Sequence, residues 1–335
     1  MPWIAYTMQS GAVMLAYRTA TEWLREALPC EPAARDEYRI SLSIDSKSRP
    51  HLAYQSRATD HLIYGVRDVN WQFEEANTEG GLFPGSVRFV IMKVCHGVFQ
   101  NPPFKDIPHL CYQAGLSLWH ASKAPPPTNP SAPPTWRKNV EKVDSSNLVE
   151  KGWFTALDFD SQEVLRTAYF DDRSPAGVTA RQLRMATMIP GVDFPGQPNE
   201  WRVEILDRGD VLGECPAMAH SITGEGIISY FERKTRSLKI CMFGNFPESP
   251  AIEVVSSDVS DVRSAVGVSH QSRFCIVYGA GGRLRYATRT GIGTFAVEDV
   301  EAGGGWPQLI FDSVGSAHVA HVVNGTLRYA LAPQT

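Results

Sequence analysis

The stretch Pro50-His51-Leu52-Ala53-Tyr54, followed after a polar break by Leu62-Ile63-Tyr64-Gly65-Val66-Arg67, decides the fold. Both segments are short and rich in β-branched and aromatic residues, and a polar connection separates them. This combination predicts two strands of an antiparallel pair. Weaker copies of the same two-segment phrase occur at six other places in the chain, so the pair is the unit of an internal repeat.

The repeat has a regular period along the chain. The first segment of the seven copies ends at Tyr6, Tyr54, Tyr112, Tyr169, Tyr230, Tyr278 and His321, with steps of 43 to 61 residues. A third strand opens on an aromatic residue after five of the pairs, at Trp23, Trp71, Trp136, Trp201 and Phe295. A further strand precedes six of the pairs, at residues 39–45, 86–94, 153–159, 217–222, 263–268 and 307–311. Short strands repeated at this period indicate an all-β fold, a β-propeller with four-stranded antiparallel blades.

The strand count favours seven blades in one domain over residues 1–335. The predicted blades cover about residues 1–32, 33–80, 81–147, 148–209, 210–260, 261–303 and 304–335. The first blade lacks a recognisable inner strand and the last lacks an outer one, so we expect the N- and C-terminal strands to close the ring. The alternative is six blades, with the last inner strand completing the N-terminal blade. That alternative leaves the strand pair at 318–331 outside the ring, and it therefore ranks second.

Bulk composition limits the classes of partner. The net charge is -4 and 20% of the residues are charged, which gives no basic footprint for nucleic acid. No window approaches 18 consecutive apolar residues, so no membrane partner is predicted. The six cysteines show no paired spacing, which favours reduced thiols and a soluble, cytoplasmic protein. The sequence leaves the oligomeric state open.

Residues that lead into the inner strands should lie closest to the mouth of the central channel. Aromatic rings with a few arginines and one histidine at such a place are typical of a small-molecule pocket. The candidates for catalysis are His220, Arg88, Arg263 and Asp36, and those for substrate binding are Tyr38, Arg39, Phe83, Trp153, Met218 and Trp306. His220 is the first choice for proton transfer, as the histidine nearest to an inner-strand start. The alternative is a hydrogen-bonded core histidine.

The residue after the first segment differs from blade to blade. It is Gln55 and Gln113 in two blades, and charged clusters with Asp171 and Glu232 follow in two others. Dissimilar side chains from several loops on one rim would suit a single asymmetric site, so these four are added to the substrate-binding candidates. The alternative is a set of solvated turns. The histidines His51, His109 and His318 instead share one position of the repeat, which predicts a role in the scaffold.

No nucleotide, phosphate-loop or zinc motif is present, so the sequence predicts no cofactor and no metal. The phrase Pro-His-Leu-Ala-Tyr…Leu-Ile-Tyr-Gly-Val-Arg…Trp resembles the repeat of sialidase-like and lectin-like β-propellers. The resemblance covers nearly the whole chain at scaffold positions, and it implies architecture without any catalytic residue. Ser43-Ile44-Asp45 lacks the glycine and tryptophan of a sialidase Asp box.

Three functions follow as hypotheses, each with a small molecule or a protein as partner. The first is a cofactor-independent enzyme with one small-molecule site, because the blades have diverged everywhere except at packing positions. Its reaction would be an elimination, cyclisation or cycloaddition, as in the propeller cyclases and hetero-Diels–Alder catalysts of natural-product pathways that it resembles in fold. The alternatives are a lectin-like carbohydrate-binding propeller and a protein-interaction platform.

Overall fold

The chain is described by a computed structural model. It covers residues 1–34, 40–76, 87–97, 105–124, 131, 133–136, 141–145, 149–173, 182–189, 200–208, 212–244 and 250–332. Every regular element in these ranges is a β-strand. No helix that could cross a membrane is found in the part of the chain described.

The first compact unit comprises Met1–Leu157 and Thr187–Arg202. Its sheets consist of β1 (Trp3–Thr7), β2 (Val13–Arg18) and β3 (Trp23–Ala27); β4 (Ser41–Ile44), β5 (Pro50–Gln55), β6 (Leu62–Arg67) and β7 (Trp71–Glu75); and β8 (Arg88–Cys95), β9 (Ile107–Ala114), β10 (Ser117–Ala124), β11 (Thr135–Trp136) and β12 (Glu141–Ser145). In the third sheet β11 and β12 both pair with β10. Apart from β12, each strand pairs with its neighbour in sequence, as the repeat of hairpins predicts.

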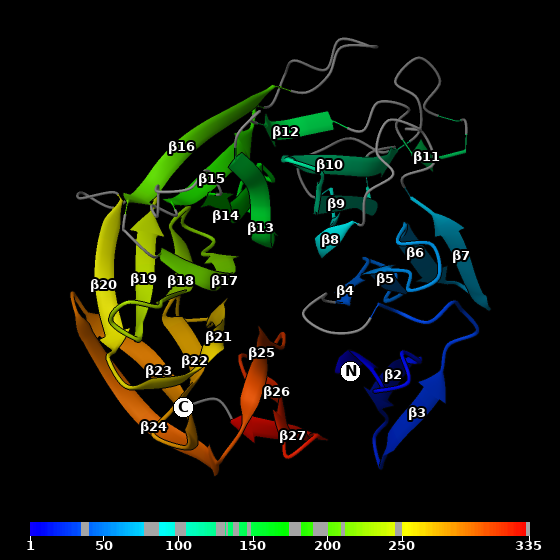
Figure 1. Cartoon of the computed structure of the whole chain (residues 1–335). Coiled ribbons are helices and arrows are strands. Elements are labelled where there is room, and N and C mark those ends of the chain that lie inside the picture. The colour runs from blue at the N-terminus through cyan, green and yellow to red at the C-terminus, as the bar shows by residue number, and fades with distance from the viewer. Residues whose placement is uncertain are drawn as a thin grey trace. The chain divides into compact units, whose positions relative to one another are not determined.

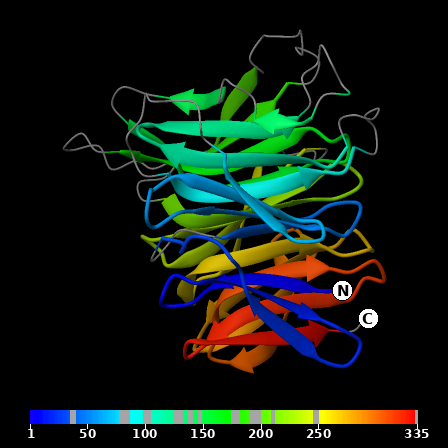
Figure 2. The ribbon, with the colours of Figure 1, turned by 90° about the vertical axis from the view of Figure 1, so that its right-hand side faces the viewer.

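The second compact unit comprises Asp158–Ala186 and Val203–Thr335. Its sheets consist of β17 (Leu212–His220), β18 (Gly226–Glu232), β19 (Ser237–Phe243) and β20 (Ala251–Ser256); β21 (Val259–Val268), β22 (Phe274–Ala280), β23 (Arg283–Gly291) and β24 (Thr294–Ala302); and β25 (Gly305–Phe311), β26 (Ala317–Val323) and β27 (Thr326–Ala332). One more sheet, β13 (Val149–Phe159), β14 (Leu165–Arg173), β15 (Gln182–Met188) and β16 (Trp201–Arg208), has strands assigned to both ranges. Figure 2 shows the orange and red strands running back and forth as hairpins.

These seven sheets confirm the prediction of a seven-bladed β-propeller (Figure 1). Within the described residues the first and last sheets have three strands each, and β25 pairs with β26 rather than with a strand of the first sheet. The six-blade alternative is therefore wrong. Closure of the ring by the terminal strands stays a prediction, as does the single domain.

In the blades between the first and the last, the second strand is largely buried. All residues of β5 and β22 are buried, and so are all residues of β18 except the last. A continuous apolar run of this length is the pattern of a strand covered on both faces. All six cysteines are free thiols, and five of them are buried, as predicted for small apolar side chains.

The repeated aromatic residue at the end of this strand links one blade to the preceding one. The Tyr54 hydroxyl donates to the Glu31 carbonyl at 3.0 Å, and the Tyr230 hydroxyl donates to Asp207 Oδ2 at 2.7 Å. In the last blade His321 takes this role, with Nε2 2.7 Å from Glu301 Oε2. The ring fills the interface and its polar end reaches the edge, as predicted for an amphipathic aromatic residue.

The turn between the inner and second strands is also repeated, although the sequence motif is degenerate. Asp45 Oδ1 accepts the amides of Lys47 and Arg49 at 2.9 and 2.7 Å. Asp160 and Asp312 accept two amides each in the same way, and Ser221 does so with its hydroxyl. Such side-chain-to-backbone bonds close a turn locally. The glycine and tryptophan of an Asp box are therefore not required for this turn geometry.

Several inner strands carry a β-bulge in their earlier part. Four non-glycine residues there have left-handed backbone angles: Phe89, Phe154, Cys215 and Trp306, with φ of 53° to 58°. The register shifts beside them, between Arg88 and Ile91 and between Gly305 and Gln308, mark the extra residue. A bulge redirects the side chains next to it, and bulky residues rarely adopt this conformation without support from their surroundings.

Candidate functional site

Four of the predicted site residues, Asp36, Tyr38, Arg39 and Phe83, lie outside the described residues. The other ten are described. Two of them, Arg263 and Trp306, come together at an exposed position. The remaining eight pack against neighbouring strands or hold turns in place. Among them, His220 lies at the opposite end of its strand from the predicted one.

The pair that meets is Arg263 and Trp306, on neighbouring inner strands of the second unit. The guanidinium of Arg263 lies over the Trp306 ring, 3.4 Å from its centroid. The stack joins β21 to the beginning of β25. The indole carries 56% of its full exposure, so the ring is open to solvent despite the arginine. The Trp306 ring therefore lies outside the core and is accessible to a ligand.

Asp261 fixes the geometry of this pair. Its Oδ1 accepts the amide of Arg263 at 3.2 Å, and its Oδ2 accepts the amide of Trp306 at 3.0 Å. Gly305 leaves room for the carboxylate, because a Cβ there would come within 2.6 Å of Asp261 Oδ2. One carboxylate thus supports the left-handed Trp306 backbone and the strand that carries Arg263. Sequence reasoning missed Asp261, although its place at the start of an inner strand could have indicated it.

Arg88 and Trp153 occupy comparable strands in the first unit. Arg88 opens β8, opposite Gln113 in the register. Trp153 contacts Phe89, with ring centroids 5.2 Å apart, and Phe154 at 5.8 Å. Phe89 and Phe154 are buried, so this aromatic cluster packs the bulges of β8 and β13.

The prediction that His220 lies near the start of an inner strand is wrong. The strand β17 begins at Leu212, and His220 is its last residue, at the opposite end. Its Nδ1 lies 3.1 Å from Asp158 Oδ2, its ring meets Phe243 edge-on, and its side chain is 2% exposed. Nε2 is buried without a hydrogen-bond partner in the described part of the chain. This is the environment of the core histidine named as the alternative. Met218, two residues earlier, is buried as well.

The four residues that follow the repeated tyrosine brace hairpins. Gln55 Nε2 donates to Asp60 Oδ1 at 3.0 Å, and Gln113 donates to the Gly115 carbonyl. Asp171 accepts the Gln182 amide at 2.7 Å and Arg184 Nε at 3.1 Å.

Glu232 pairs with Lys239 Nζ at 3.1 Å and accepts the Thr235 hydroxyl. Partial burial raises the pKa of Glu232, but the bonds from Thr235 and Lys239 outweigh it and hold the pKa below its ordinary value. These contacts differ in chemistry and share one structural task, which favours turns over a common rim site.

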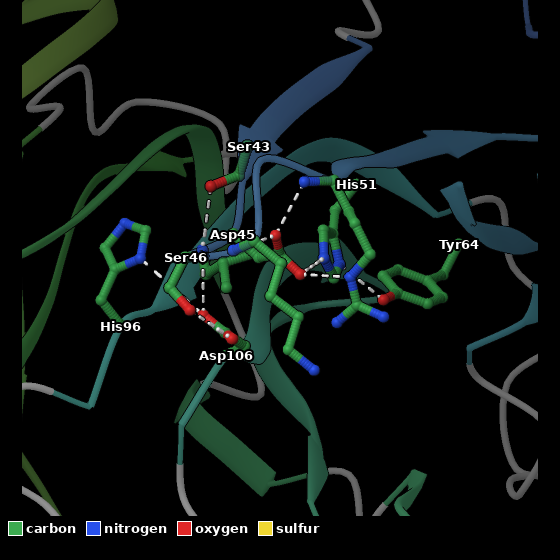
Figure 3. Close-up of polar contacts among 10 residues, drawn as sticks. Ser43, Asp45, Ser46, His51, Tyr64, His96 and Asp106 are labelled. Atoms are coloured by element: carbon green, nitrogen blue, oxygen red, sulfur yellow. Dashed lines mark hydrogen bonds and ion pairs between the residues drawn. The ribbon is translucent and has the colours of Figure 1, made fainter. Parts of the chain in front are cut away.

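The repeated histidines form hydrogen-bonded chains inside the blades. His51 Nε2 lies 3.3 Å from Asp45 Oδ2, and His51 Nδ1 lies 2.7 Å from the Tyr64 hydroxyl (Figure 3). Asp312, His318 and Tyr329 repeat this chain in the last blade, with distances of 3.0 and 2.6 Å.

In the blade formed by β8 to β12, His109 Nδ1 instead lies 3.0 Å from His120 Nε2. A chain that recurs in blades far apart in sequence serves the blade, so the predicted scaffold role is confirmed. No group of three or more possible metal ligands is found among the described residues.

No protein-family model and no curated protein matches the chain. Solved structures do match. The Penicillium chrysogenum α-L-arabinanase complexed with arabinobiose is similar over 90% of this chain and 96% of its own, with a TM-score of 0.58 and 11% identity.

The Hadza microbial sialidase Hz136 is similar over 96% of this chain and 73% of its own, with a TM-score of 0.57 and 10% identity. The fucose-specific lectin from Aleuria aurantia covers 90% of this chain and 91% of its own, with a TM-score of 0.52 and 12% identity. These likenesses confirm the resemblance to sialidase-like and lectin-like propellers at the level of the fold.

Proposed function

We propose that this protein binds a carbohydrate through the exposed Trp306 ring and the Arg263 guanidinium. The observation that carries the proposal is the stacking of the two side chains, whose backbone amides both donate to Asp261. The face of an indole ring carries negative potential, which suits the C–H groups on one side of a sugar ring. The guanidinium edge offers several N–H donors for hydroxyl oxygens.

The fold gives independent support. Structures with the same fold include an arabinanase bound to arabinobiose and a fucose-specific lectin. A small-molecule carbohydrate is therefore a better-supported ligand than a cyclisation substrate. The cofactor-free cyclase stays a prediction from the sequence, because no contact among the described residues favours it. Analysis of the products after incubation with the sugar shows whether the bound sugar is also cleaved.

Titration calorimetry with L-arabinobiose, L-fucose and a panel of common mono- and disaccharides tests the proposal. We expect saturable binding of at least one sugar and a loss of about 10-fold or more in affinity for Trp306→Ala, as for an exposed tryptophan anchor. Arg263→Ala should weaken binding as well. Product analysis after prolonged incubation separates binding from hydrolysis.

The matched control is Ile310→Ala, which alters a side chain of equal exposure, 55%, on the same strand. It should bind like the unmodified protein, and all variants should keep the β-rich circular dichroism spectrum. Binding that survives Trp306→Ala unchanged, or a panel with no ligand at all, would reject the site.

A further inference from the structure

A cavity lies between the sheets β21–β24 and β25–β27, away from Trp306. Its volume is about 100 Å³, and it is partly open to solvent. Its polar wall includes Arg273, Tyr286, Thr288 and Glu298, and its facing wall includes Phe311, Ala317 and Ala332. None of these residues was singled out from the sequence, and none belongs to the proposed carbohydrate site.

The corresponding space between the sheets β4–β7 and β8–β12 is filled by the protein itself. Lys123 forms an ion pair with Glu74, and the Trp136 indole N–H donates to the same carboxylate at 3.1 Å. The ammonium of Lys123 lies 5.5 Å from the centre of the Tyr64 ring, and the Trp136 ring meets Tyr64 edge-on at 5.1 Å. At this interface the Glu74 carboxylate and the Tyr64 ring thus bind the Lys123 ammonium and the Trp136 indole.

The repeat shows that the carboxylate and the phenol ring recur at the cavity. Tyr64 is the register partner of Glu74, and Tyr286 is the register partner of Glu298. The second strand supplies a neighbour of the tyrosine from the same position in both places. His51 Nδ1 lies 2.7 Å from the Tyr64 hydroxyl, and Cys275, at the equivalent position, interacts with Tyr286. Glu298 and Tyr286 are therefore the counterparts of Glu74 and Tyr64.

The cation and the indole do not recur. Ser122 pairs with His109 and Leu331 pairs with His318, so the next residues, Lys123 and Ala332, hold the same place in their blades. The methyl group of Ala332 replaces the ammonium. Within the described residues no strand follows β27 in its sheet, and so no described strand of this sheet supplies a counterpart of Trp136. Glu298 is exposed, and no hydrogen bond or ion pair of its side chain is present in the part of the chain described.

We propose that this cavity binds a small aromatic amine, whose ammonium group pairs with Glu298 and whose ring packs beside Tyr286. The ligand supplies the two groups that Lys123 and Trp136 supply inside the other interface. An ammonium ion between a carboxylate and an aromatic face gains both ion pairing and a cation–π contact. Arg273 also lines the cavity, and its counterpart Arg49 is neutralised by Asp45, whereas Ser269 replaces that aspartate here. An anionic ligand at Arg273 is the competing outcome.

Tryptamine, tryptophol and indole-3-acetate separate these outcomes, because they share the indole and differ in the charge of the side chain. We expect saturable tryptamine binding to the full chain near pH 7, by calorimetry or ligand-observed NMR, with tryptophol and indole-3-acetate at least about 10-fold weaker. Glu298→Gln should remove this preference. Ala332→Lys should also abolish tryptamine binding, because the new ammonium would pair with Glu298 as Lys123 pairs with Glu74. This variant keeps the Glu298 carboxylate in the cavity.

The matched control is Asp299→Asn, which neutralises the neighbouring residue of β24, a partner of Arg283 and Arg285 outside the cavity lining. It should bind tryptamine like the unmodified chain. Equal binding of tryptophol, stronger binding of indole-3-acetate, undiminished binding by Glu298→Gln, or no saturable binding of tryptamine would each overturn the proposal.

Discussion

His51 shows how one buried side chain makes stability depend on pH. Burial lowers the pKa of His51 below its ordinary value of 6.5, although the bond to Asp45 opposes this effect. The folded chain then binds fewer protons at this residue than the unfolded chain does. The stabilisation is present above the ordinary pKa and is lost as the pH falls below it.

We therefore expect the free energy of unfolding to fall between about pH 7.5 and about pH 5.5, and to fall less in His51→Gln. Glutamine keeps hydrogen-bonding groups for Asp45 and Tyr64 but does not titrate. Urea unfolding at the two pH values measures the difference. The lowered pKa of Asp45 acts at more acidic pH, outside this window. An equal loss in both proteins would contradict the assignment.

Individual residues were predictable where the repeat constrains them. The shared position of His51 and His318 predicted a scaffold role, and the inner-strand positions of Arg263 and Trp306 made them candidates for one site, although their stacking was not predicted. Asp261 was not predicted, because its role depends on a contact with Trp306 of the next blade. The missing signal for Glu298 was in the sequence: aligning the blades would have set Ala332 against Lys123.

At the scale of the element, the turn between inner and second strands depends on one side chain that accepts two amides. In the turn after β13, Asp160 Oδ1 accepts the amides of Gln162 and Val164, each at 2.9 Å, and Oδ2 pairs with Arg166 at 3.0 Å. Other blades place serine at this position, at Ser221 and Ser269. Serine at this position therefore forms the same type of turn as aspartate elsewhere in the chain.

Asp160→Ala should lower the free energy of unfolding by about 1–3 kcal/mol, because two amides and Arg166 lose their acceptor. Asp160→Ser should cost clearly less, since its hydroxyl can still accept the amides. Urea unfolding curves of the three proteins decide this. Equal destabilisation by alanine and serine would show that the turn does not depend on these bonds.

Element boundaries were predictable for the second and third strands but not for the inner ones. Continuous apolar runs mark β5 and β22 directly. The bulges interrupt the alternation of the inner strands, and β17 shows two register shifts between Leu212 and Ala217. The early part of β17 therefore lacks the alternation of apolar and polar residues that predicts a strand. For this reason His220 was assigned to the wrong end of its strand.

At the scale of the whole molecule, the blade count was predictable because hairpins are local and their copies can be counted. The function was less predictable, since the scaffold positions that repeat carry no chemistry. The proposed sites instead occur where blades differ: an exposed tryptophan at the start of β25, and a small residue in place of a lysine at the end of β27. Comparing blades within one chain therefore gives candidate sites that no shared motif marks.

The most direct measurement is a crystal structure of the chain soaked with the best-binding sugar of the panel. The proposed function predicts a sugar ring on the Trp306 indole, with hydroxyl groups within hydrogen-bond distance of the Arg263 guanidinium. A sugar bound elsewhere, with the Trp306 ring uncovered, would contradict it.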